Sequence, residues 1–199
     1  MKYSSLTKEE LTKLYLAEKL SVRAIANLYS CSEQRINYWL HKFEIEKRSI
    51  SESLYLKHNP SGDPFFFKEP KTLEEAFLFG LGIGLYWGEG NKKNTHSIRL
   101  GNTDPKLIVK FIEFLTETYG VKKEKFRFGL QIFSDINSEK ALSFWIKKLG
   151  VSRKQFGKVI VTPARGVGNY RQKTLYGVLT IYVSNKKLRD LIVAEVEKL

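Results

Sequence analysis

The spacing of apolar residues predicts a helical N-terminal part and a C-terminal part that mixes helices with strands. Apolar positions three and four residues apart are typical of a helix with one buried face, and strict alternation is typical of a half-buried strand. Capping signals sharpen the boundaries, because Thr7 and Thr72 are each followed three residues later by glutamate and Asn185 precedes the last periodic run. The expected helices cover residues 8–17, 22–29, 33–43, 73–88, 105–119, 138–149 and 186–198, and the expected strands cover 97–101, 126–133, 159–161 and 174–183.

Residues 49–71 are expected to form a linker between two domains. The segment contains the turn-rich sequence Asn-Pro-Ser-Gly-Asp-Pro at 59–64, followed by three phenylalanines that should anchor it on one of the domains. The predicted fold class is therefore α+β, with a three-helix domain at residues 1–48 and an α/β domain at residues 72–199.

The apolar spacing of the first domain is that of a helix-turn-helix. Counted from Val22, the positions that this motif buries hold apolar or small residues, with Ala26 where the two helices cross. The pattern resembles the helix-turn-helix of resolvases and related site-specific recombinases and regulators, although Ser30 stands where most members place a glycine in a left-handed turn. The expected buried residues are Ile25, Ala26, Tyr29, Cys31, Ile36 and Trp39.

This resemblance implies that the third helix enters the major groove of DNA. Gln34 or Asn37 would then read adenine, and Arg35 or Lys42 would contact phosphate. A helical adaptor that uses the same geometry to contact proteins is the alternative. The expected DNA-binding residues of this domain are Gln34, Arg35, Asn37, Tyr38 and Lys42.

Charge also favours a nucleic-acid partner. The 199-residue chain carries a net charge of +13, and residues 151–189 contain basic residues but no acid. The hydrophobic content of 42% is that of a globular protein. The single cysteine, Cys31, excludes an internal disulfide and a cysteine-rich zinc site. No apolar signal segment follows Met1, so we expect a cytoplasmic protein with access to DNA and no membrane partner.

The longest uncharged run, residues 76–88, combines helical capping with regularly spaced glycines. At this length the helix is too short to cross a bilayer, which takes about 20 apolar residues, so it should pack against protein. Gly80, Gly84 and Gly88 recur at every fourth residue and would form a bare stripe that lets another helix approach closely. Glu89 follows at the negative end of the helix dipole, where a metal ion or a basic partner would offset its charge.

The eight residues 83–90, Ile-Gly-Leu-Tyr-Trp-Gly-Glu-Gly, resemble the end of the LAGLIDADG motif of homing endonucleases. The resemblance implies that two such helices pack face to face through Gly80, Gly84 and Gly88. It also implies that Glu89, with Gly88 beside it, holds a catalytic Mg²⁺ ion. The family's first acid corresponds to Trp87 in this chain, and this departure weakens the inference of catalysis.

Because residues 91–199 contain no second motif of this kind, the resemblance implies a homodimer on a near-palindromic double-stranded DNA target. It further implies helices on one face of a curved antiparallel sheet, with DNA on the other face. Arg99, Arg127 and Gln131 would then contact DNA from the strands, although a solvated strand face is an equal alternative for each. In the basic loop, Arg165 and Arg171 would reach phosphates and Lys173 would be a catalytic base or phosphate clamp.

Three functions remain open from the sequence. The first is a magnesium-dependent DNA endonuclease, which the position of Glu89 between two glycines favours. The second is a DNA-binding transcriptional regulator that does not cleave, which Trp87 in place of an acid favours. The third is a helper in the splicing of intron RNA. A purely structural role, in which Glu89 pairs with a lysine at the end of a buried helix, is the simplest alternative to all three.

Overall fold

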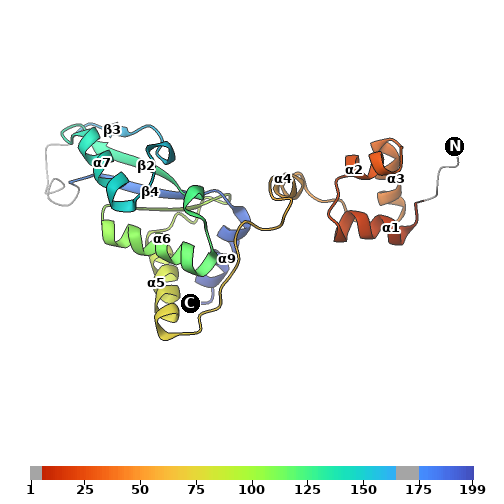
Figure 1. Ribbon diagram of the computed structural model, residues 1–199, viewed down its shortest axis with the longest axis horizontal. Coiled ribbons are helices and arrows are strands. Elements are labelled where there is room, and N and C mark those ends of the chain that lie inside the picture. Colours follow the sequence, from red (N-terminus) through yellow and green to blue (C-terminus); the bar gives the residue numbers. More distant parts are fainter. Residues whose placement is uncertain (1–5, 165–174) are drawn as a thin grey trace. The chain divides into compact units, whose positions relative to one another are not determined.

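A computed structural model describes residues 6–164 and 175–199 of the chain, and the fold is α+β (Figure 1). The chain divides into two compact units, Met1–Pro64 and Phe65–Leu199. The first unit contains helices and the second combines helices with one sheet. Each unit has its own hydrophobic core.

The first unit begins with α1 (Lys8–Thr12), which continues into a π-helical turn, η1 (Lys13–Ala17), and is followed by α2 (Val22–Leu28), α3 (Glu33–Lys42) and α4 (Ile50–His58). Side-chain oxygens of Thr7, Ser21 and Ser32 accept backbone N–H groups in the first turns of their helices, as the sequence predicts for Thr7. Ser30 has a φ of 49°, so the predicted left-handed turn between α2 and α3 is confirmed.

The core of the first unit contains the residues expected from the helix-turn-helix spacing. Ile25, Ala26 and Ile36 are buried, and Tyr29, Cys31 and Trp39 are half-buried against the same cluster. The other buried members of this cluster are Leu6, Leu11, Tyr15, Leu40 and Ile45.

Arg48 links the segment between α3 and α4 to the turn between η1 and α2. Its guanidinium donates to the carbonyls of Lys19 (2.9 Å) and Leu20, and its backbone N–H donates to the hydroxyl of Tyr15 at 3.0 Å. The guanidinium also lies 4.1 Å from the centre of the Tyr15 ring. Helix α4 follows directly, within the segment predicted to be a linker, and none of its side chains is buried.

The second unit begins with residues 65–71, which pack against the C-terminal end of α6 (Pro105–Tyr119). The N–H of Phe66 donates to the carbonyl of Tyr119 at 3.1 Å, and the N–H of Lys68 donates to that of Thr118 at 2.8 Å. Phe67 lies 5.6 Å from the Tyr119 ring, centre to centre. The predicted phenylalanine anchor is therefore confirmed, and it lies on the second unit.

The second unit contains a sheet of four described strands, in the spatial order β1 (Ile98–Asn102), β4 (Val178–Val183), β2 (Arg127–Phe133) and β3 (Ile160–Thr162). Strand β4 pairs antiparallel with both β1 and β2, whereas β3 pairs parallel with β2. The expectation of an antiparallel sheet is therefore wrong at this edge, and the sheet is mixed. The reason is the connection, because α7 lies between β2 and β3 and a crossover returns the chain in the same direction. The described helices of this unit are α5 (Leu73–Glu89), α6 (Pro105–Tyr119), the short η2 (Lys123–Lys125), α7 (Ser138–Leu149), the short η3 (Arg153–Gln155) and α9 (Lys186–Val196).

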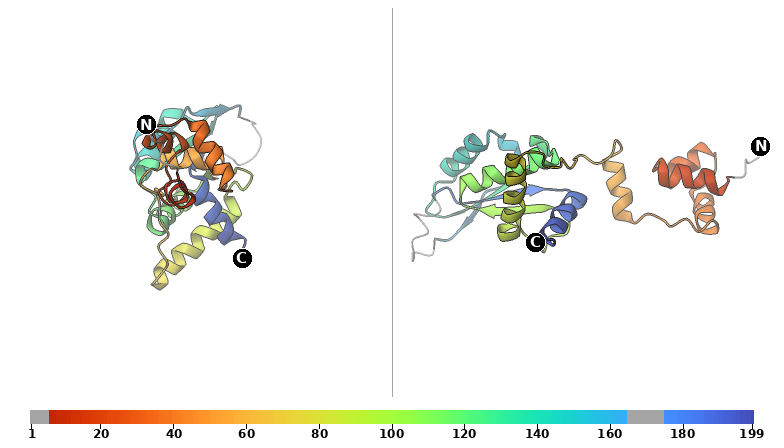
Figure 2. Two further views of the ribbon diagram at one scale, coloured as in Figure 1. Left: turned by 90° about the vertical axis from the view of Figure 1, so that its right-hand side faces the viewer. Right: turned by 90° about the horizontal axis from the view of Figure 1, so that it is seen from below.

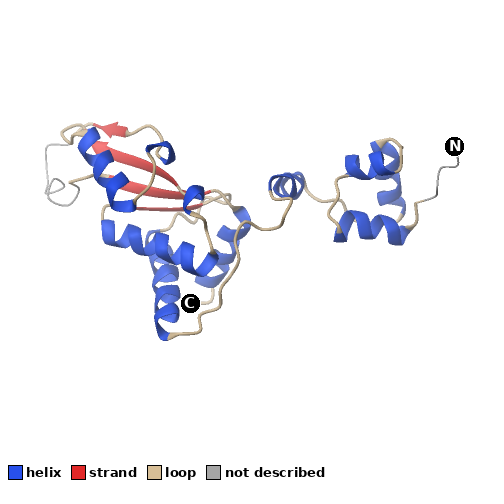
Figure 3. Cartoon of the chain, viewed as in Figure 1, coloured by secondary structure: helices blue, strands red, loops and turns tan. Residues whose placement is uncertain are grey.

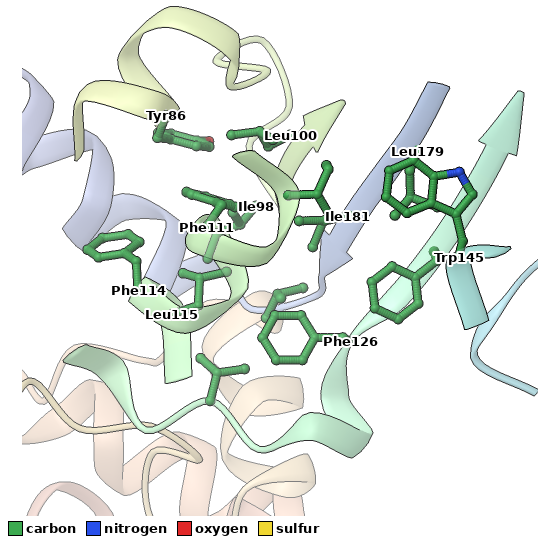
Figure 4. Close-up of a cluster of buried hydrophobic side chains, with 14 of the residues drawn as sticks. Tyr86, Ile98, Leu100, Phe111, Phe114, Leu115, Phe126, Trp145, Leu179 and Ile181 are labelled. Atoms are coloured by element: carbon green, nitrogen blue, oxygen red, sulfur yellow. The ribbon is translucent and has the colours of Figure 1, made fainter. Parts of the chain in front are cut away.

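The helices of this unit cover one face of the sheet, as Figure 3 shows, and the view from below in Figure 2 has α5 and α6 in front of the strands. Tyr86 from α5, Phe111 from α6 and Trp145 from α7 are fully buried in one core with the inward-facing strand residues (Figure 4). The indole N–H of Trp145 donates to the carbonyl of Tyr176 at 2.9 Å, which satisfies its one polar group. The opposite face of the sheet is left partly exposed.

Candidate nucleic-acid interface and metal site

One face of α5 is apolar, uncharged and uncovered by the described residues. A Cβ atom placed on Gly80 or Gly84 would have no neighbouring atom within 4 Å. Leu73, Phe77 and Trp87 share this face and are 82%, 68% and 59% exposed. The spacing 73, 77, 80, 84, 87 alternates steps of four and three, which is the a/d pattern of a helix that packs on another helix. We call these five residues the α5 seam.

The opposite face of α5 uses a different glycine to pack within the unit. A Cβ atom on Gly82 would lie 2.1 Å from Cγ of Phe114, so only glycine lets α6 approach this closely. The predicted stripe of Gly80, Gly84 and Gly88 therefore lies on a different face of α5 from the contact between α5 and α6. Gly80, Gly84 and Gly88 point to open space, and Gly82 points into the core.

Glu89, the last residue of α5, is exposed at a well-fixed junction. The next residues pair with β1, since Gly90 bridges to Leu100 and the N–H of Asn91 donates to the carbonyl of Arg99 at 2.8 Å. A Cβ atom on Gly90 would lie 2.3 Å from the carbonyl oxygen of Tyr86, so glycine is required there. The pairing of Gly90 with Leu100 therefore places Glu89 next to strand β1.

Two cations secure the same junction. The Lys92 ammonium donates to the carbonyl of Trp87, and the Arg189 guanidinium on α9 donates to the carbonyl of Lys92 at 2.7 Å. Lys92 thus supplies positive charge at the negative end of the α5 dipole. Among the described residues, Glu89 itself forms no ion pair, so the structural role in which it pairs with a lysine is not observed.

The donors at the end of α5 fit a Mg²⁺ ion as part of a ligand set. Within residues 6–164 and 175–199, no three His, Cys, Asp or Glu side chains are grouped as a metal site. Mg²⁺ commonly binds one or two carboxylates and takes its remaining oxygens from water and substrate phosphates. The carboxylate of Glu89 and the carbonyl of Gly88 meet that description only when further oxygen ligands come from a second subunit, DNA or water.

The open face of the sheet brings two of the predicted arginines together. Arg99 on β1 and Arg127 on β2 are both in register with Tyr182 on β4, which lies between them. The Arg99 guanidinium lies 5.3 Å from the centre of the Tyr182 ring, and its Nε donates to Oγ of Ser97 at 2.9 Å. The Arg127 guanidinium donates to the carbonyls of residues 124 and 126 at 2.6 and 2.8 Å.

The next set of paired residues on this face of the sheet contains two glycines and one threonine. Thr180 is flanked in register by Gly101 and Gly129, so only its hydroxyl-bearing side chain rises from the centre. Gln131, the third predicted strand residue, is exposed beyond this row and in register with Val178. None of the outward strand residues on β1, β2 and β4 is acidic. Thr180 was not predicted, although alternation along β4 places it on the same face as Tyr182.

The five residues predicted to contact DNA from the first unit all lie on α3. Gln34, Arg35, Tyr38 and Lys42 are exposed and Asn37 is half-buried, while the opposite face of the helix contributes to the core. The hydroxyl of Ser32 accepts the N–H of Arg35 and fixes the first turn.

We compared the chain with models of protein families, with curated proteins and with solved structures. None of them matches. Three predicted site residues, Arg165, Arg171 and Lys173, lie outside the described residues. No described helix combines the length and apolar character needed to cross a membrane.

Proposed function

We propose that the chain is a double-stranded DNA-binding protein of the LAGLIDADG homing endonuclease lineage that acts as a homodimer and cleaves DNA with Mg²⁺. The observation that carries the proposal is the open α5 seam, which ends beside an exposed Glu89 that forms no ion pair with any of the described residues. In this proposal the first unit is a resolvase-type helix-turn-helix and the second is a LAGLIDADG-type domain.

DNA binding is supported by two separate surfaces. Helix α3 presents amide and basic side chains next to each other, the combination that reads base edges and contacts phosphate in a major groove. The open sheet face presents Arg99 and Arg127 on either side of Tyr182 and no acid among its described outward strand residues. The net charge of +13 adds long-range attraction to phosphate.

Self-association is supported by the chemistry of the seam. A monomer that leaves Leu73, Phe77 and Trp87 exposed on one helix keeps a continuous apolar strip in water. A second copy presents the same strip, and a two-fold axis through the seam would bring the glycines of both helices into close contact. The axis would also bring the two copies of Glu89 towards each other, which supplies a second carboxylate.

In this assembly the residues of the chain bind and orient the DNA. Arg99 and Arg127 would hold backbone phosphates, and the Gly90–Leu100 bridge would keep Glu89 at a fixed distance from the sheet. Glu89 and the carbonyl of Gly88 would hold the metal. When bound, Mg²⁺ supplies activation of water and stabilisation of the leaving oxygen in phosphodiester hydrolysis.

A regulator that binds DNA without cutting it is the second candidate, and a specific observation favours it. The Lys92 ammonium already lies on the carbonyl of Trp87, so the end of α5 has a cation of its own. In addition, Trp87 occupies the position of the first motif acid, which leaves one carboxylate per subunit there.

One experiment separates the two candidates. Duplexes selected from a random-sequence library by the full-length protein are incubated with Mg²⁺ or EDTA and either wild type, Glu89→Gln or Glu197→Gln. Nicking that needs Mg²⁺, is lost in Glu89→Gln and persists in Glu197→Gln supports the endonuclease. Tight binding by all three proteins without nicking supports the regulator. Failure to select any duplex above background would overturn both.

A further inference from the structure

The N-terminal half of α5, the half away from Glu89, borders a groove that shares Leu73 and Phe77 with the α5 seam. This groove of about 620 Å³ runs between α5, α6 and the chain segment that leads into α5. The residues that matter for its chemistry are Leu73, Glu74, Phe77 and Leu78 on α5 and Glu113 and Glu117 on α6.

The lining of the groove is apolar where α5 faces it. Leu73 and Phe77 are among the most exposed large hydrophobic side chains described, and Leu78 lies half-buried beside them. Exposed leucine and phenylalanine on neighbouring turns of one helix favour a binding surface over a solvated one, because they leave apolar area in water.

The charge around the groove is opposite to that of the protein. Four glutamates and two lysines line it, which gives a local net charge of −2 on a chain of +13. Glu75 is paired with Lys68 at 2.6 Å and Glu113 with Lys110 at 2.8 Å. Glu74 forms no ion pair among the described residues, and the same holds for Glu117. Two carboxylates are therefore available to a basic partner.

We propose that this groove docks a basic amphipathic helix of a partner protein, with leucine or aromatic side chains on Leu73 and Phe77 and lysine or arginine on Glu74 and Glu117. Nucleic acid is disfavoured here because phosphate would meet four carboxylates. The same groove of a second copy is equally acidic, so groove-to-groove self-association places like charges together. An apolar groove between helices with charged edges suits a helical ligand. The proposal does not depend on DNA cleavage, but because it uses Leu73 and Phe77 of the α5 seam, a bound partner helix would compete with seam-to-seam pairing of two copies.

The test uses the full-length protein and three labelled 18-residue model peptides. One is an amphipathic helix of leucine and lysine, one replaces every lysine with glutamate, and one replaces every leucine with serine. Because the whole protein is strongly basic, binding of a basic peptide requires a local acidic site. We expect the leucine–lysine peptide alone to bind the wild type, with chemical-shift changes at residues of α5 and α6.

Charge reversal identifies the site. The double variant Glu74→Lys, Glu117→Lys should bind the leucine–lysine peptide at least about tenfold more weakly and should gain binding of the leucine–glutamate peptide. The control Glu139→Lys, Glu197→Lys changes the net charge equally at exposed glutamates elsewhere and should bind as the wild type does. Equal binding by both double variants, or no binding by the wild type, would overturn the proposal. So would loss of self-association in Glu74→Lys, Glu117→Lys by sedimentation, because the occupant would then be a second copy.

Discussion

Replacing Gly84 with alanine should stabilise the second unit, although Gly84 lies in the middle of the proposed interface. A glycine inside a helix destabilises the folded protein by about 0.5–1 kcal/mol relative to alanine, because glycine loses more backbone conformational freedom on folding than alanine does. A Cβ atom at Gly84 meets nothing within 4 Å, so no clash offsets that gain. We therefore expect the melting temperature to rise by roughly 2–4 °C per kcal/mol gained.

Gly82→Ala is the matched comparison, since it lies two residues away on the same helix. Its Cβ would lie 2.1 Å from a ring atom of the fully buried Phe114. Overpacking of this kind costs about 1–3 kcal/mol, which exceeds the helical gain. The two substitutions should thus change stability in opposite directions, as measured by thermal unfolding followed by circular dichroism at a protein concentration low enough to keep the chain monomeric.

The oligomeric state measured by sedimentation provides a second test of the open face of α5. Gly84→Leu places a bulky side chain where a second helix would approach, so it should fold normally and sediment as a monomer at concentrations where the wild type is a dimer. A fall in stability for Gly84→Ala in the dilute sample would refute the reasoning about the open face. An unchanged dimer in Gly84→Leu would show that the seam is not the interface.

Three further expectations concern other parts of the chain. Arg48→Ala should destabilise the first unit by about 1–3 kcal/mol in urea unfolding, because it removes the hydrogen bonds to two carbonyls; full stability in the variant would contradict the role assigned to Arg48. The hydrogen bond from Lys68, together with backbone N–H groups, lowers the pKa of Glu75 to about 2, so its contribution to stability is present at neutral pH and is lost as the pH falls from about 4.5 towards 2. Glu75→Gln should therefore loosen the start of α5 at pH 7, measured by hydrogen exchange, and have a much smaller effect near pH 2, where about half of the Glu75 carboxylates are protonated; an equal effect at both values would exclude the ion pair as the cause. On selected duplexes, Lys42→Ala should reduce the salt dependence of binding by about one charge for all sequences, whereas Gln34→Ala should weaken discrimination at one base position; the reverse pattern would place α3 differently on DNA.

The sequence predicts the local structure well where a side chain acts on its own backbone. The caps at Thr72 and Asn185 are observed as hydrogen bonds to Glu75 and Leu188, and the helices begin where these residues place them. The left-handed conformation of Ser30 is the one that the resemblance to the helix-turn-helix of resolvases implies for this position. Such features need no information about distant parts of the chain.

Contacts between distant residues were not predictable in the same way. The short apolar run at residues 159–161 predicts a strand but not its direction, so the parallel pairing of β3 with β2 could not be predicted from the sequence. Gly82 sits between members of the four-residue glycine repeat and looks like another flexible position, yet it is the glycine that Phe114 requires. Arg48 resembles a phosphate contact by its charge, whereas its guanidinium is engaged by two carbonyls and a tyrosine ring.

The hydrogen bond from Arg189 to the carbonyl of Lys92 joins residues 97 positions apart. The hydrogen bonds of the loop that follows Glu89 are therefore completed only when α9 docks, which is a non-local contact. A polypeptide ending before α9 would lose this hydrogen bond and would also leave the core of the second unit without Leu188 and Ile192, both of which are fully buried. The last helix of the chain and the end of α5 therefore belong to one cooperative unit, although residues 90–185 lie between them.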